Sequence, residues 1–121
     1  MKLTSEISAI VTGGASGLGE GTARMLAAQG VKVGIFDMNA DRGKKVAGEI
    51  GGVFAKVDVS KSQSVEDGLD LVRAINGQER IMVNCAGIGG AAKTVARKRD
   101  TGEIVPHDLD AYIRIININL I

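Results

Sequence analysis

The sequence predicts an α/β fold, in which a doubly wound parallel sheet of about four strands is flanked by helices. Apolar runs short enough for buried strands alternate with stretches of helical periodicity, and both patterns recur in the same order along the chain. Glycine accounts for 17 of 121 residues, whereas the aromatic residues make up only 2%. An aliphatic core with glycines at tight turns suits parallel strands that helices cover on both faces.

Each predicted element follows from a local pattern. The strands are apolar runs bounded by glycine or polar residues, and we expect them at 7–11, 31–36, 53–57 and 80–84. Helices are expected at 18–29, at 39–50, and from a capping Ser60 to about residue 75. The expected inward-facing residues are Leu18, Thr22, Met25 and Leu26 in the first helix, Val46, Ala47 and Ile50 in the second, and Val65, Leu69 and Val72 in the third.

The residues after Gly87 have a different character. Residues 88–106 hold a basic stretch and the turn-like Asp100-Thr101-Gly102, and we expect a long surface loop there. Asp108 is a candidate N-cap for a last element. The pattern of that element fits both a half-buried strand, by its strict alternation over 116–120, and a helix with one apolar face. The helix is favoured.

Charge and composition exclude several classes of protein. Lys and Arg number 15 against 14 Asp and Glu, and a net charge of +1 excludes nucleic-acid binding by bulk charge. The first residues lack a signal-peptide pattern, and the apolar runs are shorter than the roughly 20 residues of a membrane-spanning helix. One cysteine cannot form an intramolecular disulfide. We expect a cytoplasmic protein with no metal site and no nucleic-acid or membrane partner.

The first predicted strand runs into a glycine-rich turn, Thr12-Gly13-Gly14-Ala15-Ser16-Gly17-Leu18-Gly19. A nucleotide diphosphate needs close approach of the backbone, free N–H groups and the positive end of a helix dipole. Glycines at 13, 17 and 19, between a strand and a helix, supply all three. The spacing alone is common in glycine-rich chains, so a purely structural turn is the alternative. The position directly after the first strand favours a phosphate site.

Asp37 ends the second predicted strand, about 20 residues beyond the turn. A carboxylate at this place accepts hydrogen bonds from ribose hydroxyls and repels the additional phosphate of NADP. The sequence therefore predicts NAD as the cofactor. A surface aspartate at a strand end is the alternative interpretation.

These residues resemble the short-chain dehydrogenase/reductase family. The family's turn motif, T-G-x-x-x-G-x-G, is matched at Thr12, Gly13, Gly17 and Gly19. The resemblance implies a Rossmann-type sheet with cofactor contacts at Gly13, Ser16, Gly17, Leu18 and Gly19 of the turn, at Asp37, at Asp58 and Val59 beside the adenine, and at Asn84, Ala86 and Gly87 of an N-N-A-G-like motif. Cys85 stands where that motif has its second Asn. We expect Cys85 to be a small buried hydrophobe rather than a redox or metal residue.

Asn119 is similar to the family's helix asparagine, which helps to hold a proton-relay water. The resemblance thus implies a catalytic role for Asn119 and a helix over the last segment. It covers the whole chain but only the first half of a typical member. Residues 1–121 are therefore interpreted as the N-terminal half of an NAD-binding domain, with an incomplete sheet.

Residues 83–88 and the long loop after them look like the type II 3-hydroxyacyl-CoA dehydrogenase branch of the family. Members of that branch oxidise 3-hydroxyacyl-CoA esters, and some act on hydroxysteroids, as NAD-dependent tetramers. The resemblance implies an alcohol, ketone or acyl-CoA substrate and a homo-oligomer. The basic residues Lys93, Arg97, Lys98 and Arg99 form a hypothetical contact to CoA phosphates, and a solvated basic stretch is the alternative.

The family's catalytic centre is missing from this sequence. Hydride transfer there needs a serine and a tyrosine with a lysine four residues later, which lowers the pKa of the tyrosine. The only tyrosine is Tyr112, followed four residues later by Ile116, and no serine follows Ser64. We therefore expect this chain alone to be inactive: either the cofactor-binding half of an NAD-dependent oxidoreductase, or an inert NAD-binding or sensing module. An NADP-dependent reductase of 3-oxoacyl groups is disfavoured by Asp37.

Overall fold

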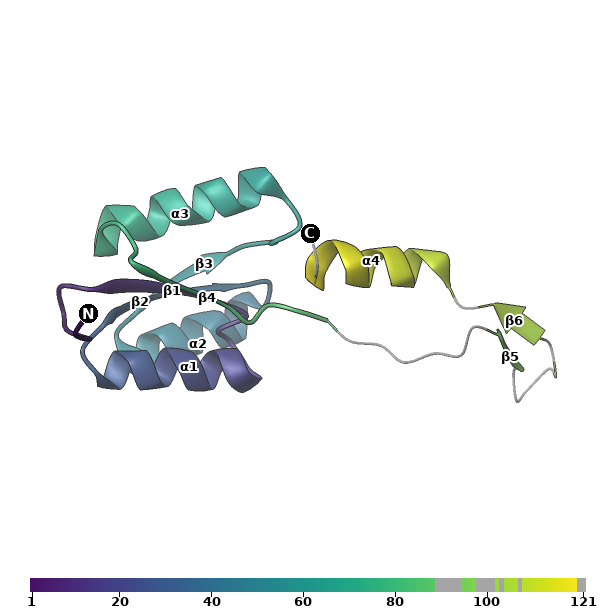
Figure 1. The fold of residues 1–121 in the computed structure, drawn as a ribbon, viewed down its shortest axis with the longest axis horizontal. Coiled ribbons are helices and arrows are strands. Elements are labelled where there is room, and N and C mark those ends of the chain that lie inside the picture. Colours follow the sequence, from purple (N-terminus) through teal and green to yellow (C-terminus); the bar gives the residue numbers. More distant parts are fainter. Residues whose placement is uncertain (89–94, 98–101, 103, 107, 120–121) are drawn as a thin grey trace. The chain divides into compact units, whose positions relative to one another are not determined.

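The computed structural model describes residues 1–88, 95–97, 102, 104–106 and 108–119, and it divides into two compact units, Met1–Ala86 and Gly87–Ile121 (Figure 1). The elements of the first unit are β1 (Ser8–Thr12), α1 (Gly17–Ala28), β2 (Lys32–Asp37), α2 (Ala40–Ile50), β3 (Val53–Lys56), α3 (Ser62–Asn76) and β4 (Ile81–Asn84). Those of the second unit are β5 (Val95–Arg97), β6 (Ile104–Pro106) and α4 (Leu109–Asn119).

The four strands of the first unit form one parallel sheet in the order β3-β2-β1-β4. The helices that connect them cover both faces: α1 and α2 lie on one, and α3 lies on the other (Figure 1). The predicted α/β class with a doubly wound parallel sheet is confirmed. All of its predicted strands and helices are present, with bounds that shift by one or two residues.

The core of the first unit lies on both sides of the sheet, because successive strand side chains point to opposite faces. Val11 and Ile35 belong to the cluster that includes Leu26 of α1 and Val46 of α2. The neighbouring positions Ile10 and Phe36 belong to a second cluster with Val72 of α3. Every residue of β1 is buried, which explains why its sequence lacks polar alternation.

The predicted inward face of α1 is mostly wrong. Leu26 is buried as expected, but Leu18 is 87% exposed and Met25 is also exposed. The buried positions are instead Gly19, Ala23 and Leu26. Because α1 packs closely on the turn at its start, small residues are needed on its inner face. A pattern built on large apolar residues therefore selects the wrong side of the helix.

Ser60 does not cap α3, contrary to the prediction. The N-cap is Lys61, which makes no side-chain capping bond. The hydroxyl and the N–H of Ser60 both donate to Oδ1 of Asp58, at 2.6 and 3.0 Å. The serine is thus used to close the turn after β3, so it is not available to the first amides of the helix.

In the second unit, the segment 88–106, predicted as a long surface loop, contains two short strands that the prediction did not include. Residues 95–97 and 104–106 pair as the antiparallel strands β5 and β6, which the β-branched Val95, Ile104 and Val105 favour. The last element is a helix, as predicted. Asp108 caps it as expected, because its Oδ1 accepts from the N–H of Asp110 at 2.9 Å and of Ala111 at 3.4 Å.

Candidate functional site

The candidate site centres on the carboxyl ends of β1 and β4. In an open parallel sheet, a crevice forms where connections leave a strand toward opposite sides, and ligands bind there. In the first unit this point is β1, which has β2 on one side and β4 on the other. Thr12 and Asn84, the last residues of β1 and β4, are paired in register. The glycine-rich turn and the segment after β4 therefore begin side by side.

Thr12 joins these two segments. Its side chain is buried, and its Oγ1 accepts hydrogen bonds from the N–H groups of Cys85 and Ala86 at 3.1 Å each. Its carbonyl also accepts from Cys85 N–H at 3.1 Å. Cys85 is half-buried rather than buried as predicted, because it lies one residue beyond the end of β4. The threonine thus fixes the backbone around the predicted site residues Asn84 and Ala86.

The turn itself leaves no room for side chains at two of its glycines. A Cβ on Gly13 would lie 2.8 Å from the backbone N and Cα of Ala86. A Cβ on Gly19 would lie 2.0 Å from the carbonyl oxygen of Gly13, so α1 begins in direct contact with the turn. Gly17 has a φ of 56°, and no atom lies within 4 Å of the place of its Cβ. The turn is therefore closely packed on its inner side and open beside Gly17.

The N-terminus of α1 keeps its amide groups available. Ser16 is the N-cap in an extended conformation, and its side chain makes no capping bond. The first helical bond runs from Glu20 N–H to the Ser16 carbonyl at 3.1 Å. Among the described residues, the N–H groups of Gly17, Leu18 and Gly19 have no hydrogen-bond acceptor. Free amides and the positive end of the helix dipole favour an anion here.

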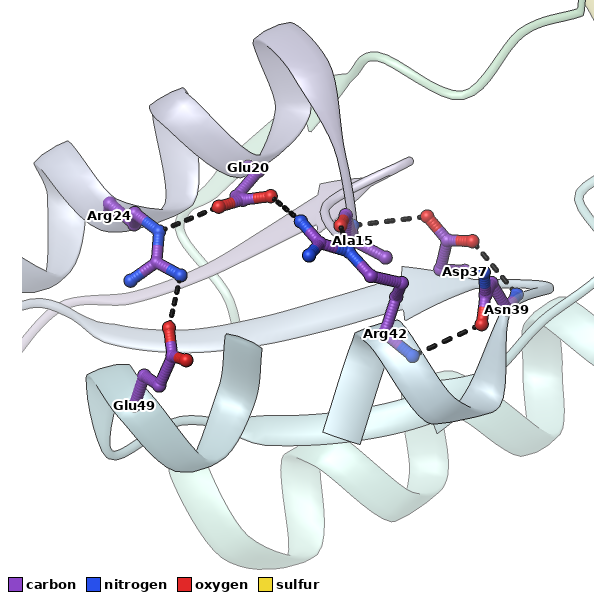
Figure 2. Close-up of polar contacts among 7 residues, drawn as sticks. All are labelled: Ala15, Glu20, Arg24, Asp37, Asn39, Arg42 and Glu49. Carbon is purple, nitrogen blue, oxygen red and sulfur yellow. Dashed lines mark hydrogen bonds and ion pairs between the residues drawn. The ribbon is translucent and has the colours of Figure 1, made fainter. Parts of the chain in front are cut away.

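Asp37 lies at the end of β2, with its carboxylate directed toward the turn (Figure 2). Its Oδ2 accepts from the N–H of Ala15 at 3.1 Å, and its Oδ1 accepts from the N–H of Asn39 at 2.9 Å. An ionised carboxylate offers about four acceptor positions, so further donors can still bind. The structure thus joins Asp37 to the glycine-rich turn, 22 residues away in sequence.

Asp58 and Val59 lie in the turn after β3. Val57 N–H donates to the carbonyl of Asp37 at 3.2 Å, which brings this turn next to the end of β2. The backbone N–H of Asp58 donates to the hydroxyl of Ser64 at 2.9 Å, and its carboxylate accepts from Ser60. Both predicted residues are therefore at the same edge of the sheet as Asp37.

Gly87 and Asn119, the remaining predicted site residues, belong to the second unit. The side-chain amide of Asn119 pairs with the backbone of Ile88: Oδ1 accepts from its N–H at 2.8 Å, and Nδ2 donates to its carbonyl at 2.6 Å. A Cβ on Gly87 would lie 3.2 Å from Asn119 Oδ1, so a larger residue there would crowd this pairing. The structure brings these two residues together, and the role of Asn119 in a proton relay stays a prediction.

A network of ion pairs links α1 and α2 beside the turn (Figure 2). Glu20 of α1 pairs with Arg24 one helical turn later and with Arg42 of α2, and Arg24 also pairs with Glu49 of α2. Hydrogen bonding to Arg24 lowers the pKa of Glu20, against an opposing effect of burial. The bond to Glu49 raises the pKa of Arg24, and Arg24 in turn lowers that of Glu49. These pKa shifts favour the charged forms of Glu20, Arg24 and Glu49.

The sequence did not predict the pairing of Glu20 with Arg42 or the anchoring role of Thr12. Thr12 could have been found, because it is a fixed position of the turn motif. Glu20 and Arg42 lie 22 residues apart on separate helices, and no periodic pattern connects them. Their pairing follows only from the packing of α1 and α2 on the same face of the sheet.

The remaining predictions concern metal ions, membranes and the basic residues after Gly87. Among the described residues, no group of three or more His, Cys, Asp and Glu side chains could hold a metal ion. In the same part of the chain, no helix is long and apolar enough to cross a membrane. Of the basic residues proposed for CoA phosphates, Arg97 lies in β5, whereas Lys93, Lys98 and Arg99 lie outside the described residues.

Comparisons with known proteins show what the chain is similar to. Residues 8–121 match the family model described as short chain dehydrogenase. A 3-hydroxyacyl-CoA dehydrogenase type-2 from Drosophila melanogaster is 40% identical over 114 residues, which cover 93% of this chain and 43% of that protein. A mitochondrial borneol dehydrogenase from Lavandula x intermedia is 33% identical and is matched over 93% of this chain and 40% of its own length. The chain thus spans less than half the length of these curated relatives.

A solved structure extends the similarity to three dimensions. The crystal structure of 3-ketoacyl-(acyl-carrier-protein) reductase from Brucella melitensis, complexed with NADH, matches with a TM-score of 0.82 and 32% sequence identity. The match covers 98% of this chain and 46% of that one.

Proposed function

The chain belongs to the short-chain dehydrogenase family, and on that premise we propose that it binds NAD as the N-terminal half, residues 1–121, of the cofactor-binding domain of an oxidoreductase. One observation carries the proposal: the uncapped start of α1 opens beside Gly17, with the Asp37 carboxylate hydrogen-bonded to the same turn. The NADH complex of the Brucella melitensis reductase supports the same cofactor.

The diphosphate is proposed to bind at the turn. Its negative charge is favoured by the α1 dipole, and the N–H groups of Gly17, Leu18 and Gly19 are available as donors. The exposed Ser16 hydroxyl, which no helix amide uses, is a further donor. Gly13 takes part through its backbone, since its side-chain position is filled by Ala86.

The adenosine is proposed to lie across the ends of β2 and β3. Asp37 would accept hydrogen bonds from the ribose hydroxyls while keeping its bonds to Ala15 and Asn39. Its charge disfavours the 2′-phosphate of NADP. Asp58 and Val59 lie at the same edge, which supports the predicted contact with the adenine.

The nicotinamide end is proposed to face the segment after β4, at Asn84, Ala86 and Gly87. Bound NAD would supply the acceptor for a hydride from a secondary alcohol. Asn119 is proposed to take part in the proton relay of the complete enzyme. Its side chain is engaged with Ile88, so it also positions the backbone that follows Gly87.

The substrate is proposed to be a secondary alcohol or the corresponding ketone. The relatives named above act on a 3-hydroxyacyl-CoA and on borneol, and both are secondary alcohols. We favour the acyl-CoA because of the resemblance of residues 83–88 to that branch. We further propose a cytoplasmic homo-oligomer.

Titration with both dinucleotides tests the cofactor. We expect NAD to bind more tightly than NADP, and Asp37→Ala to cost about 1.5–3 kcal/mol of NAD binding, the range for a hydrogen bond to a charged group. Asp41→Ala is the matched control, because it removes an exposed carboxylate in the first turn of α2, four residues after Asp37. NADP binding more tightly to the unchanged protein, or an equal dissociation constant for NAD in the Asp37 variant, would contradict the proposal.

The alternative is an inert NAD-binding module, which would carry the proposed NAD site without a Tyr-x-x-x-Lys pair. Both candidates bind NAD, so turnover separates them. We expect the 121-residue chain to form no NADH from a 3-hydroxyacyl-CoA. NADH formation by the protein as its gene encodes it supports the enzyme, and its absence there supports the module.

A further inference from the structure

Arg42 makes a contact that ion pairing alone does not explain. It lies in the first turns of α2, and its guanidinium reaches the start of α1 (Figure 2). Nε donates to the carbonyl oxygen of Ala15 at 3.1 Å, and Nη2 pairs with Glu20. One planar group thus holds both the backbone of the glycine-rich turn and the helix that follows it.

The bond to Ala15 fixes the direction of a neighbouring amide. A peptide unit is planar and trans, and no cis peptide bond occurs among the described residues. When the Ala15 carbonyl points to Arg42, the N–H of Ser16 must therefore point the opposite way. Asp37 holds the preceding peptide unit through the N–H of Ala15. Two consecutive peptide units of the turn are thus oriented by side chains from the β2–α2 segment.

Arg42 is itself held in place at its backbone. The side chain of Asn39 caps α2 by accepting from Arg42 N–H at 3.1 Å. The N–H of Asn39 in turn donates to Asp37. Asp37, Asn39 and Arg42 therefore form one connected set, which ends on both polar groups of the buried Ala15.

The ion pair between Arg42 and Glu20 also affects the charge at the start of α1. Glu20 is an acidic residue in the first turn of α1, the helix whose N-terminus is proposed to bind the diphosphate. An unpaired carboxylate there would oppose an anionic ligand. Arg42 and Arg24 both pair with Glu20, and Arg24 also pairs with Glu49, so the four charges cancel.

We propose that Arg42 is a positioning residue for dinucleotide binding: it orients the Ala15–Ser16 peptide unit so that the Ser16 N–H faces the diphosphate. The inference rests on the proposed NAD site and deepens it. Arg42 acts through the turn and need not touch the cofactor.

Arg24 provides a matched control. It is an arginine in the same network, with bonds to Glu20 and Glu49, but in the described residues it makes no bond to the turn. Arg24→Met removes two ion pairs, whereas Arg42→Met removes one ion pair and the bond to Ala15. A role in stability alone would therefore make the Arg24 variant at least as damaging.

The test measures NAD dissociation constants by calorimetry, with thermal unfolding as a parallel measurement, on the protein as its gene encodes it. We expect Arg42→Met to weaken NAD binding about tenfold or more, and Arg24→Met to change it less than about twofold, although both lower the unfolding temperature. Equal effects of the two variants on NAD binding would overturn the proposal.

Two further variants separate geometry from charge. Arg42→Lys keeps a cation that can pair with Glu20 but lacks the planar fork, so we expect weakened NAD binding in a protein that folds normally. In the double variant Arg42→Met/Glu20→Gln, the unpaired charge is gone and the bond to Ala15 is still missing, so binding should stay weak. Full recovery in either variant would overturn the positioning role. Failure of the unchanged protein to bind NAD would instead reject the proposed function.

Discussion

Different interactions stabilise each of the two units of the chain. In the part of the chain that the structure describes, all buried hydrophobic residues lie in the first unit, on both faces of its parallel sheet. In the second unit, α4 has no buried residue. What fixes its end is the pairing of the Asn119 amide with the backbone of Ile88. The first unit is therefore specified by packing, whereas in the second unit the described end of α4 is held by hydrogen bonds.

This difference matches the different roles that are proposed for the two units. The turn, Asp37 and the end of β4 need fixed positions to bind a dinucleotide, and the packed sheet supplies that rigidity. Gly87 and Asn119 belong to the second unit, whose described residues include no buried hydrophobic side chain. Local opening needs little free energy where few apolar contacts are lost, so α4 is expected to open more readily than the helices of the first unit.

Truncating a buried residue should strongly destabilise the first unit, whereas truncating a residue of α4 should have little effect on stability. Phe36 is 1% exposed and packs in the cluster with Val72, so Phe36→Ala should lower the free energy of unfolding by about 3–5 kcal/mol. Ile113→Ala in α4 is the control, because that side chain is already exposed and should change stability by less than about 0.5 kcal/mol. Urea denaturation followed by circular dichroism measures both. Similar losses would mean that α4 is packed as tightly as the sheet.

For strands that are buried on both faces of the sheet, the sequence was sufficient to predict the structure. The apolar runs of β1 and β2 have neighbours above and below, so Val11, Ile35 and Phe36 predict buried strands directly. The positions of the turn motif and of Asp37 could also be predicted, because they follow directly from where β1 and β2 end and where α1 begins. For this reason the carboxyl edge of the sheet could be anticipated from local sequence.

Contacts between distant segments could not be anticipated. Leu18 and Met25 predict the wrong face of α1, since the close approach of Gly19 to Gly13 decides which side faces the sheet. The strands β5 and β6 are three residues each, too short for a periodic pattern to register. The pairing of Arg42 with Ala15 depends on how α2 packs beside α1.

The Asn119 pairing can be tested against a residue of the same type in the same helix. Asn119→Ala should remove both bonds to Ile88, each contributing about 1 kcal/mol, and speed hydrogen exchange at the Ile88 amide. Asn117→Ala is the control, because Asn117 is exposed in α4 and has no such bond in the described structure. Unfolding of the first unit should be unaffected in both. An unchanged exchange rate at Ile88 in the Asn119 variant would mean that another contact fixes this segment.

The smallest expected effect is a pH dependence that belongs to the first unit. Arg73 of α3 pairs with Glu79 before β4 through two bonds, Nε to Oε2 at 2.8 Å and Nη2 to Oε1 at 2.6 Å. The side chain of Glu79 is only 13% exposed, and the bond to Arg73 lowers the pKa of Glu79 from its ordinary value of 4.5. A carboxyl whose pKa is lower in the folded state stabilises the fold above its unfolded pKa, and this contribution is lost as pH falls through the folded pKa.

Arg73→Met should therefore reduce stability at neutral pH and lose its effect in acid. We expect the urea midpoints of the variant and the unchanged protein to differ near pH 7 and to converge as the pH falls through the lowered pKa of Glu79. Arg80→Met removes the same charge next to Glu79, from an exposed residue that has no ion pair in the described structure, so it should change the midpoint little at either pH. A difference for Arg73→Met that persists unchanged in acid would show that packing of its aliphatic part, rather than its pairing with Glu79, joins α3 to β4.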